Sequence, residues 1–507
     1  MISFCVNEGI YLDIWKIESV TPVPKVFPPE KLHDLRQISG LLNCSKIADK
    51  IIGEMVIEDM KPTRDPSQFG NERKTSAQHY LITMLHRILT SVDKNSKKEA
   101  IAVIVNLVDW SQAFDRQSHK LGIQSFIKNG VRPGLIPILI SFFKNRKMKV
   151  KWNKQSSSTH TLNGGGPQGG LLGILEYLSQ TNDNTDFLDE KDRFKFIDDL
   201  SILEIINLIS QGLASHNFKF QVASDINTEH NQYLPVSNIN SQKYLDNLNI
   251  WTKANLMKLN ADKSKFMVVN FTENYKFNTR LSLENKILEE VIETRLLGVV
   301  INNKLTWNSN TEAIVKKAYK RMMILHNLFK FGLPMDEMVN IYILYIRSIL
   351  ETSAVVWHSS LTKKERNEIE RVQKVALKII LGSDYEDYNA ALEIAGLSTL
   401  DDRRKGLCKQ FAKNCIKNPK MYRLFPLNKI AKNTRNPEKY LVTPASTSRL
   451  ARSAIPYIQR LLNESKQICN KKMPQRGLGS MQGKNTGNMP STVCASLMNK
   501  SLDPTPI

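Results

Sequence analysis

Two adjacent aspartates interrupt an apolar stretch, Phe194-Lys-Phe-Ile-Asp-Asp-Leu-Ser-Ile-Leu203. Burying a charged carboxylate removes its hydration, so burying two neighbours is costly unless cations compensate. A strand, a turn and a second strand would resolve this conflict, because the acids would stand at the tip of a hairpin while the apolar residues enter a core. The stretch therefore predicts a β-hairpin that carries Asp198 and Asp199 at its turn.

A third aspartate ends another apolar segment. Residues 100–108 form a continuous apolar run rich in β-branched residues, which favours a buried strand, and Asp109 follows it. If this strand lies beside the hairpin, three carboxylates converge. Such a group suits two Mg²⁺ ions about 4 Å apart, which prefer oxygen ligands and accept phosphate oxygens from a substrate. An Asp-Asp pair alone is usually a solvated turn, and an Asp after a strand is commonly a helix N-cap, so only the combination carries the interpretation.

The remaining pattern divides the chain into a mixed part and a helical part. The pattern predicts almost purely helical structure over residues 311–382, with a helix stop at Gly382, and shorter helices over residues 383–465. From 466 the apolar content falls and Gly, Ser, Asn, Pro and Lys dominate, which predicts a disordered tail. Before 311, helices are expected over 77–93, 118–128, 134–143, 171–178 and 241–256, and strands over 148–152, 265–271 and 295–301, with an apolar-periodic segment over 41–57.

Charge and cysteine content narrow the class of partner and compartment. Lysine and arginine number 71 against 49 aspartates and glutamates, a net charge of +22, and a chain this basic suits a polyanion such as nucleic acid. The six cysteines form no Cys-x-x-Cys pair, so neither a zinc knuckle nor a disulfide framework is indicated. The N-terminus lacks the basic region of a signal peptide, and the longest apolar run recognised, Leu135 to Phe143, is too short to span a bilayer. We therefore expect an intracellular protein of the nucleus or cytoplasm that does not enter a membrane.

Taken in order, these segments resemble the motifs of reverse transcriptases from animal non-LTR retrotransposons. Five successive motifs are similar: Val108-Asp-Trp-Ser-Gln-Ala-Phe-Asp115, Gly166-Pro-Gln-Gly169, Phe196-Ile-Asp-Asp-Leu200, Leu259-Asn-Ala-Asp-Lys-Ser264 and Leu296-Leu-Gly-Val299. Upstream, Val23-Pro-Lys25, Leu35-Arg-Gln-Ile-Ser39 and Gln68-Phe-Gly70 are similar to finger elements that touch nucleotide and template. The resemblance covers about residues 10–465.

The resemblance implies a right-hand polymerase of the α+β class. Fingers and palm, with an antiparallel sheet, would occupy residues 1–290. The end of the palm and a helical thumb would follow over 291–382, then a helical C-terminal extension over 383–465 and the tail over 466–507. The implied activity is that of an RNA-directed DNA polymerase, a nucleotidyltransferase that binds an RNA template and a DNA primer and adds deoxynucleotides from their triphosphates.

The resemblance also implies roles for single residues. Asp109 and Asp198 would bind two Mg²⁺ ions, or Mn²⁺ in their place, with Asp199 in support. Phe114 would be a steric gate against the ribose 2′-hydroxyl, and its alternative is ordinary packing. Four further residues would bind the incoming nucleotide, namely Gln168 and Gly169 in the glycine loop and Lys25 and Arg36 on the triphosphate. Lys263 would protonate the leaving pyrophosphate. Solvated basic surface is the alternative for the three basic residues.

Departures from the family pattern keep two other interpretations open. Gln37 replaces a usual proline, Gly170 stands where serine is common, and Ile174 where proline is common, although no catalytic carboxylate is lost. The first alternative is a catalytically decayed, retrotransposon-derived protein that binds nucleic acid. The second is an RNA-dependent RNA polymerase, which would normally lack the aromatic gate. We see no segment for an endonuclease, so the expectation is a polymerase lacking that domain, with a separate endonuclease as a partner.

The expected thumb carries a basic helical face. Lysines and arginines recur opposite apolar residues, which predicts one side that packs and one side that follows a phosphate backbone. The alternative is a solvated charged face. The basic positions are Lys316, Lys317, Lys320, Arg321 and Lys330, and the apolar ones are Ile314, Ala318, Met322, Leu325 and Phe329.

Overall fold

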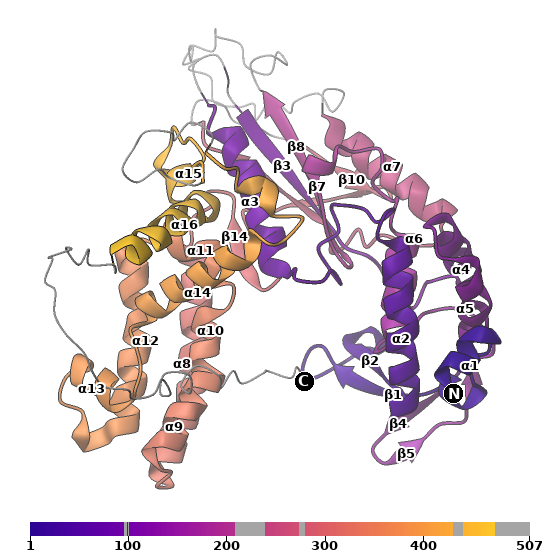
Figure 1. Cartoon of the computed structure of the whole chain (residues 1–507), viewed down its shortest axis with the longest axis horizontal. Helices are drawn as coiled ribbons and strands as arrows, with labels where there is room; N and C mark the ends of the chain where they lie inside the picture. Colours follow the sequence, from indigo (N-terminus) through magenta and orange to yellow (C-terminus); the bar gives the residue numbers. More distant parts are fainter. Residues whose placement is uncertain (96–98, 100, 208–238, 273–278, 429–439, 472–507) are drawn as a thin grey trace, which may run out of the picture. The chain divides into compact units, whose positions relative to one another are not determined.

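The computed structural model describes residues 1–95, 99, 101–207, 239–272, 279–428 and 440–471 (Figure 1). The chain forms two units, Met1–Asn463 and Glu464–Ile507. Everything below concerns the first unit unless stated. The tail predicted over 466–507 begins inside helix α16 (Ala454–Lys471) and from 472 lies outside the described residues.

A five-stranded sheet lies at the centre of the fold. The middle strand, β3, pairs antiparallel with β8 on one side and β9 on the other. The strands, in spatial order, are β12 (Glu289–Glu290), β9 (Lys265–Asn270), β3 (Ile101–Val108), β8 (Asp199–Asn207) and β7 (Arg193–Phe196). Both faces of β3 are buried, because Val103 and Val105 join one hydrophobic cluster while Ala102 and Ile104 join another. Burial on both faces explains why the strand reads as a continuous apolar run rather than an alternating one.

The hairpin expected around the two adjacent aspartates is present. Strands β7 and β8 pair antiparallel, with Phe196 opposite Asp199, so Ile197 and Asp198 form a two-residue turn. Ile197 has a φ of +56°, which a β-branched residue adopts only when its surroundings enforce it. The register between β3 and β8 sets Val108 opposite Leu200, so Asp109 and Asp199 come next to each other across the strands.

Helices cover the two faces of this sheet and form a third core at the N-terminal side (Figure 1). Helix α3 (Ala77–Val92) packs on β3 and β7, and α7 (Asn240–Ala254) joins the cluster on the opposite face. The third core lies between helices α2 (Asn43–Met60), α5 (Ile136–Phe143) and α6 (Leu171–Gln180). Helix α4 (His119–Lys128) lies against α6.

A second sheet stands beside the helices of the third core. Its order is β2-β1-β4-β5, with β6 paired to β4. The segment between β1 and β2 contains Pro28 and Pro29. The strands are β1 (Ile17–Pro24), β2 (Leu35–Gly40), β4 (Lys147–Trp152), β5 (Gln155–Ser156) and β6 (His160–Thr161).

The C-terminal part is helical, as expected, and shares its core with the central sheet. One hydrophobic cluster runs from Val103 in β3 through Ile369 in α12 to Ile458 in α16, so the α+β class is confirmed in a continuous core. Gly382, with a φ of +54°, ends α12 where the sequence placed a stop. The helices are α8 (Asn308–Lys330), α9 (Met335–Ile341), the π-helical turn η6 (Tyr342–Arg347), α10 (Ser348–Glu351), α11 (Ala354–Trp357), α12 (Lys363–Leu381), α13 (Tyr388–Ile394), α14 (Leu400–Cys415), α15 (Ser448–Arg452) and α16.

Two expectations need correction. The single strand expected over 295–301 is a hairpin, β13 (Glu293–Leu296) and β14 (Val299–Asn302). Leu297 and Gly298 form its turn with φ values of +46° and +85°, and the leucine made the turn look like part of an apolar strand. On α8 the expected apolar face is buried except at Phe329, which is 44% exposed.

One helical segment is longer and more apolar than the sequence analysis recognised. Met335–Ser360 has the length and composition of a membrane span. Half of it is buried inside the protein, including Tyr342, Ile346 and Leu350 in the core shared with the central sheet. A core helix of a soluble protein meets the same criterion, so length and composition alone do not assign this segment to a bilayer.

Candidate active site

The three aspartates converge at one end of the central strands. Asp109 follows β3, Asp198 lies in the β7–β8 turn, and Asp199 begins β8. Burial is the largest cause of a raised pKa at each of the three. Repulsion from Asp198 further raises the pKa of Asp109, and repulsion from both neighbours helps raise the pKa of Asp199 to about 6. Like charges that perturb one another in this way lie close together.

Two basic residues offset only part of this negative charge. Lys263 lowers the pKa of Asp109, and Arg36 on β2 lowers the pKa of Asp198. The shift at Asp199 has no opposing cationic cause, since burial and the two neighbouring aspartates all raise its pKa. The negative charge of the three aspartates is therefore only partly balanced by nearby basic residues, and a bound cation would balance the rest. Until a cation binds, desolvation disfavours the charged form of each acid.

The aspartates do not form a closed metal site by themselves. Across the described ranges, no three His, Cys, Asp or Glu side chains are arranged to hold a metal ion. A cation bound at the strand ends would need oxygen ligands from a second molecule. Mg²⁺ is usually bound by one or two carboxylates together with water and substrate phosphates, so an incomplete set of protein ligands is what a nucleotide-binding site would present.

The segment 259–264 holds Asp109 in place. The Asn260 backbone N–H donates to the Asp109 carbonyl over 2.8 Å, and the Asp109 backbone N–H donates to Ser264 Oγ over 3.0 Å. The Asn260 side chain also hydrogen-bonds the Asp109 carboxyl and lowers its pKa. Sequence reasoning quoted this motif but gave a role only to Lys263. Asn260 and Ser264 are polar residues on either side of Lys263 in the same motif, and that position was the sequence signal for their supporting roles.

An aromatic pair borders the carboxylates. The ring of Phe114, which is half-buried, lies 5.2 Å from the ring of Tyr177 at an interplanar angle of 34°. Tyr177 is fully buried, and its hydroxyl has no hydrogen-bond partner within the described residues. Burial and then Asp198, Asp199 and Asp109 raise the pKa of Tyr177, which places this side chain beside the acids and Phe114 against it. Sequence reasoning missed Tyr177, because in the apolar pattern of α6 it looks like any core residue.

The glycine loop packs against β2. The Ser39 backbone N–H donates to the Gln168 carbonyl over 3.1 Å, and the Gln168 side-chain amide donates to Asp115 Oδ1 over 2.9 Å. A Cβ at Gly169 would lie 2.8 Å from the Ser39 carbonyl oxygen, so this position needs glycine. The structure thus brings the loop and the strand that carries Arg36 together. Lys25, which follows β1 and is exposed, donates its backbone N–H to the Asp34 carbonyl over 2.7 Å.

The departure at Gly170 has a structural counterpart. Gly170 is the N-cap of α6 and offers no side chain to the first N–H groups of the helix. Asp49, from α2, accepts hydrogen bonds from the backbone N–H groups of Leu171 and Leu172 instead. Because the cap comes from a distant helix, the end of the glycine loop is tied to α2.

Gln68 is placed differently from the finger role that the resemblance implies. Its side chain is only 4% exposed. Gln68 Oε1 accepts hydrogen bonds from the backbone N–H of Gly70 over 2.8 Å and from that of Ile197 over 3.0 Å. Gln68 therefore supports the turn that presents Asp198 and does not face solvent as a template contact would.

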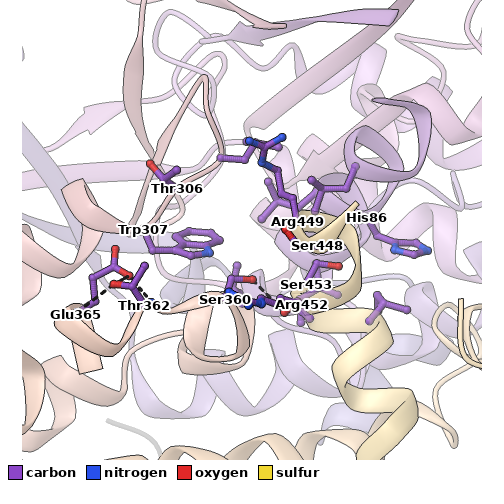
Figure 2. Close-up of a pocket in the computed structure, with 17 residues that line it drawn as sticks. His86, Thr306, Trp307, Ser360, Thr362, Glu365, Ser448, Arg449, Arg452 and Ser453 are labelled. Atoms are coloured by element: carbon purple, nitrogen blue, oxygen red, sulfur yellow. Dashed lines mark hydrogen bonds between the residues drawn. The ribbon is translucent and has the colours of Figure 1, made fainter. Parts of the chain in front are cut away.

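A separate cavity of about 170 Å³ lies between α3, α15 and the residues that precede α8 (Figure 2). Its wall is mostly apolar, with Trp307, His86 and Arg449 around it. Among the described residues that line it, Glu365 is the only acid, and Glu365 Oε2 accepts hydrogen bonds from the Thr362 backbone N–H over 2.6 Å and hydroxyl over 2.7 Å. This cavity lacks converging carboxylates, so we place the candidate active site at the strand ends.

Comparison with known proteins gives homologues from mobile elements. The chain is 22% identical over 383 residues to a probable RNA-directed DNA polymerase from transposon BS of Drosophila melanogaster, across 73% of this chain and 39% of that protein. It is 24% identical over 398 residues to the RNA-directed DNA polymerase from mobile element jockey of the same species, across 75% of this chain and 39% of that protein. The homologous region is thus less than half of either relative. No protein-family model matches the chain.

Similarity to solved structures is weak. Apo telomerase from Candida tropicalis matches with a TM-score of 0.37 and 11% identity, over 79% of this chain and 65% of that one. The RNA-dependent RNA polymerase of a human picorbirnavirus matches with a TM-score of 0.38 and 10% identity, over 77% of this chain and 64% of that one. Scores at this level do not discriminate between the two classes of polymerase.

Proposed function

We propose that this homologue of the BS and jockey polymerases is itself an RNA-directed DNA polymerase, which adds deoxynucleotides to a primer 3′-end on an RNA template. The observation that carries the proposal is the convergence of Asp109, Asp198 and Asp199 at the ends of adjacent strands. Asp109 and Asp199 are half-buried, Asp198 is exposed at the tip of the turn, and the three charges repel one another. Such carboxylates fit a site that is completed by cations and by the phosphates of a nucleotide.

Asp109 and Asp198, supported by Asp199, would hold two Mg²⁺ ions or Mn²⁺ ions. When bound, such a pair activates the attacking 3′-hydroxyl and stabilises the leaving oxygen. Arg36, whose positive charge lowers the pKa of Asp198, would bind the triphosphate through two parallel hydrogen bonds from its guanidinium group. Lys25, at the end of the strand paired with the one that carries Arg36, would be a second cation for the triphosphate. Lys263, next to Asp109, would donate a proton to the pyrophosphate oxygen that leaves.

Two other surfaces would bind the nucleic acid and the base. Gln168 and Gly169 lie in the loop that packs on β2 and would contact the incoming nucleotide. Lys316, Lys317, Lys320 and Lys330 are exposed on α8, opposite its buried face, and would follow the phosphate backbone of the template and primer. We expect such contacts to weaken as the salt concentration rises.

The same features support a proposal for the cellular location of the protein. A chain with a net charge of +22 that copies RNA belongs in the nucleus or cytoplasm, and burial of half of Met335–Ser360 in the protein core supports a protein without a membrane anchor. The relatives' remaining length leaves room for other activities, and we propose an endonuclease as a separate partner of the polymerase described here.

Phe114→Val should relax the choice of sugar. With the ring removed, a ribose 2′-hydroxyl would no longer collide with the wall that Tyr177 supports. We expect the ratio of kcat/KM for UTP to that for dTTP to rise by about 10- to 100-fold. This is the discrimination that the size of a pocket provides between substrates that differ by one small group. Steady-state primer extension with each nucleotide measures the ratio. Phe331→Val, at an 86% exposed position, is the matched control and should leave it unchanged. An unaltered ratio in Phe114→Val would remove the gate assignment.

Asp199→Asn should stabilise the protein above about pH 6 in the absence of divalent cations. The folded-state pKa of Asp199 is about 6, above the ordinary pKa of 3.8 for aspartate, so ionisation between these values disfavours the folded state. The stability of the wild type should therefore fall through this window relative to the variant. At pH 7 we expect a gain of about 1–2 kcal/mol, after allowance for partial exposure. Urea unfolding of both proteins in EDTA at pH 4 and pH 7 measures the difference in their free energies of unfolding. The same difference between variant and wild type at both pH values would contradict the prediction.

A further inference from the structure

Residues 65–70 form an outer support for the turn that carries Asp198. Gln68 lies parallel to Lys195 of β7 as an isolated bridge, with the Phe69 N–H donating to the Lys195 carbonyl over 2.8 Å and the Lys195 N–H to the Ser67 carbonyl over 3.0 Å. From this position Gln68 accepts the Ile197 N–H hydrogen bond. A Cβ at Gly70 would lie 2.6 Å from the Ile197 nitrogen, so the support fits closely against the turn.

The support is held in turn by the C-terminal extension. In the loop after α14, Lys420 Nζ donates hydrogen bonds to the backbone carbonyls of Pro66, over 3.0 Å, and Gln68. The same ammonium group lies 5.4 Å from the centre of the Phe69 ring. Two residues earlier in the loop, the Asn418 side chain donates to the Lys74 carbonyl over 2.7 Å. These contacts join segments more than 340 residues apart in the sequence.

Partial burial of the charged Lys420 side chain costs free energy, which its hydrogen-bond partners must offset. Burial lowers the pKa of Lys420 to about 8, against the attraction of Glu72 and Asp65. Carbonyl oxygens beside this half-buried ammonium hold it by charge-assisted hydrogen bonds, and losing the donor would leave those oxygens without their strongest partner. The backbone on both sides of Ser67 is therefore fixed by a residue outside the central sheet.

We propose that Lys420 is a positioning residue of the active site. Lys420 fixes the backbone at 66–68 and thereby orients the Gln68 side chain. Gln68 in turn holds Ile197 in its left-handed conformation, which sets the position of Asp198. This assignment depends on the proposed function only for its effect on catalysis, since the mechanical link stands on the hydrogen bonds alone. It gives the C-terminal extension a direct part in shaping the site where cations and nucleotide would bind.

The test compares Lys420→Met with Lys417→Met, which removes the same charge from an exposed position on the same loop. The first readout, amide hydrogen exchange of a peptide covering residues 193–199, needs no activity. We expect the Ile197 amide to exchange at least several-fold faster in Lys420→Met and at the wild-type rate in Lys417→Met. Equal protection in Lys420→Met and the wild type would overturn the proposal, whether or not the chain polymerises.

The second readout is primer extension as a function of Mg²⁺ concentration. We expect Lys420→Met to lower kcat by about tenfold, the effect of one charge-assisted hydrogen bond, and to raise the half-saturating Mg²⁺ concentration. The Kd for primer–template should stay within about twofold of the wild type, because the site of damage is the turn and not the basic helix. Lys420→Arg, which keeps charge and donors, should recover part of the loss.

A loss of activity that matches a loss of folded protein, with unchanged Mg²⁺ dependence, would show a merely structural role and overturn the proposal. If Lys420→Met does not fold, Gln68→Met removes the hydrogen bond to Ile197 directly and should give the same exchange and Mg²⁺ phenotype. Wild-type protein that is folded but inactive would count against the proposed function, while the exchange measurement would still decide the role of Lys420.

Discussion

Asp198→Ala should abolish primer extension. The carboxylate lies at the tip of the β7–β8 turn and is one of two that would hold both cations. Cations at the reacting phosphate contribute several kcal/mol of transition-state stabilisation, so losing a ligand should lower kcat by about 10³-fold or more. The loss should not come from unfolding, because a carboxylate whose pKa is raised by burial destabilises the folded state when it is charged. Primer extension and thermal unfolding, run on the same preparation, measure both effects.

Asp336→Ala is the matched control for this variant, because Asp336 is an exposed aspartate at the start of α9. It should leave both kcat and Tm near the wild-type values. Retention of wild-type activity in Asp198→Ala would show that the converging aspartates do not perform the chemistry.

Asp65→Ala should cost the fold about 3–5 kcal/mol, the effect of leaving a buried charge without its partner. Asp65 is 5% exposed and pairs with two buried cations, Lys195 Nζ at 2.6 Å and Arg193 Nη2 at 3.3 Å. Burial lowers the pKa of Lys195, and Asp65 opposes that shift. Both cations lie on β7, so their release would also loosen the strand that leads to Asp198.

Urea unfolding followed by circular dichroism measures this cost as a shift of the midpoint. Glu368→Ala is the control, because Glu368 pairs with Lys364 across 3.9 Å on the surface and such a pair contributes about 0–1 kcal/mol. A shift in Asp65→Ala no larger than in the control would mean that the two cations find other partners.

Local pattern predicted the elements that bear the chemistry. β3 was predictable because its run is apolar and β-branched up to Asp109 except at Asn106, and the β7–β8 hairpin because two acids break an apolar stretch. The hairpin β13–β14 was missed, since Leu297 occupies a turn position that polar residues or glycine usually mark.

Support from distant residues could not be predicted in the same way. Asp49 caps α6 from α2, and Lys420 holds the carbonyls at 66–68 from the C-terminal extension. Neither interaction leaves a local signature, because each needs two segments whose proximity is set by tertiary packing. Sequence reasoning assigned Gln68 to the nucleotide and template surface for the same reason, while its burial under the Ile197 turn appears only in three dimensions.

The central claim is that the aspartates at the strand ends form the centre of an RNA-directed DNA polymerase. Its most direct test is extension of oligo(dT) on poly(rA) by the purified chain with Mg²⁺, using dTTP and UTP in parallel. The account predicts incorporation of dTTP that requires a divalent cation and is lost in Asp198→Ala. Preferred incorporation of UTP would favour an RNA-dependent RNA polymerase. Folded protein that binds the primer–template but incorporates neither nucleotide would contradict the claim and identify a decayed, nucleic-acid-binding relative.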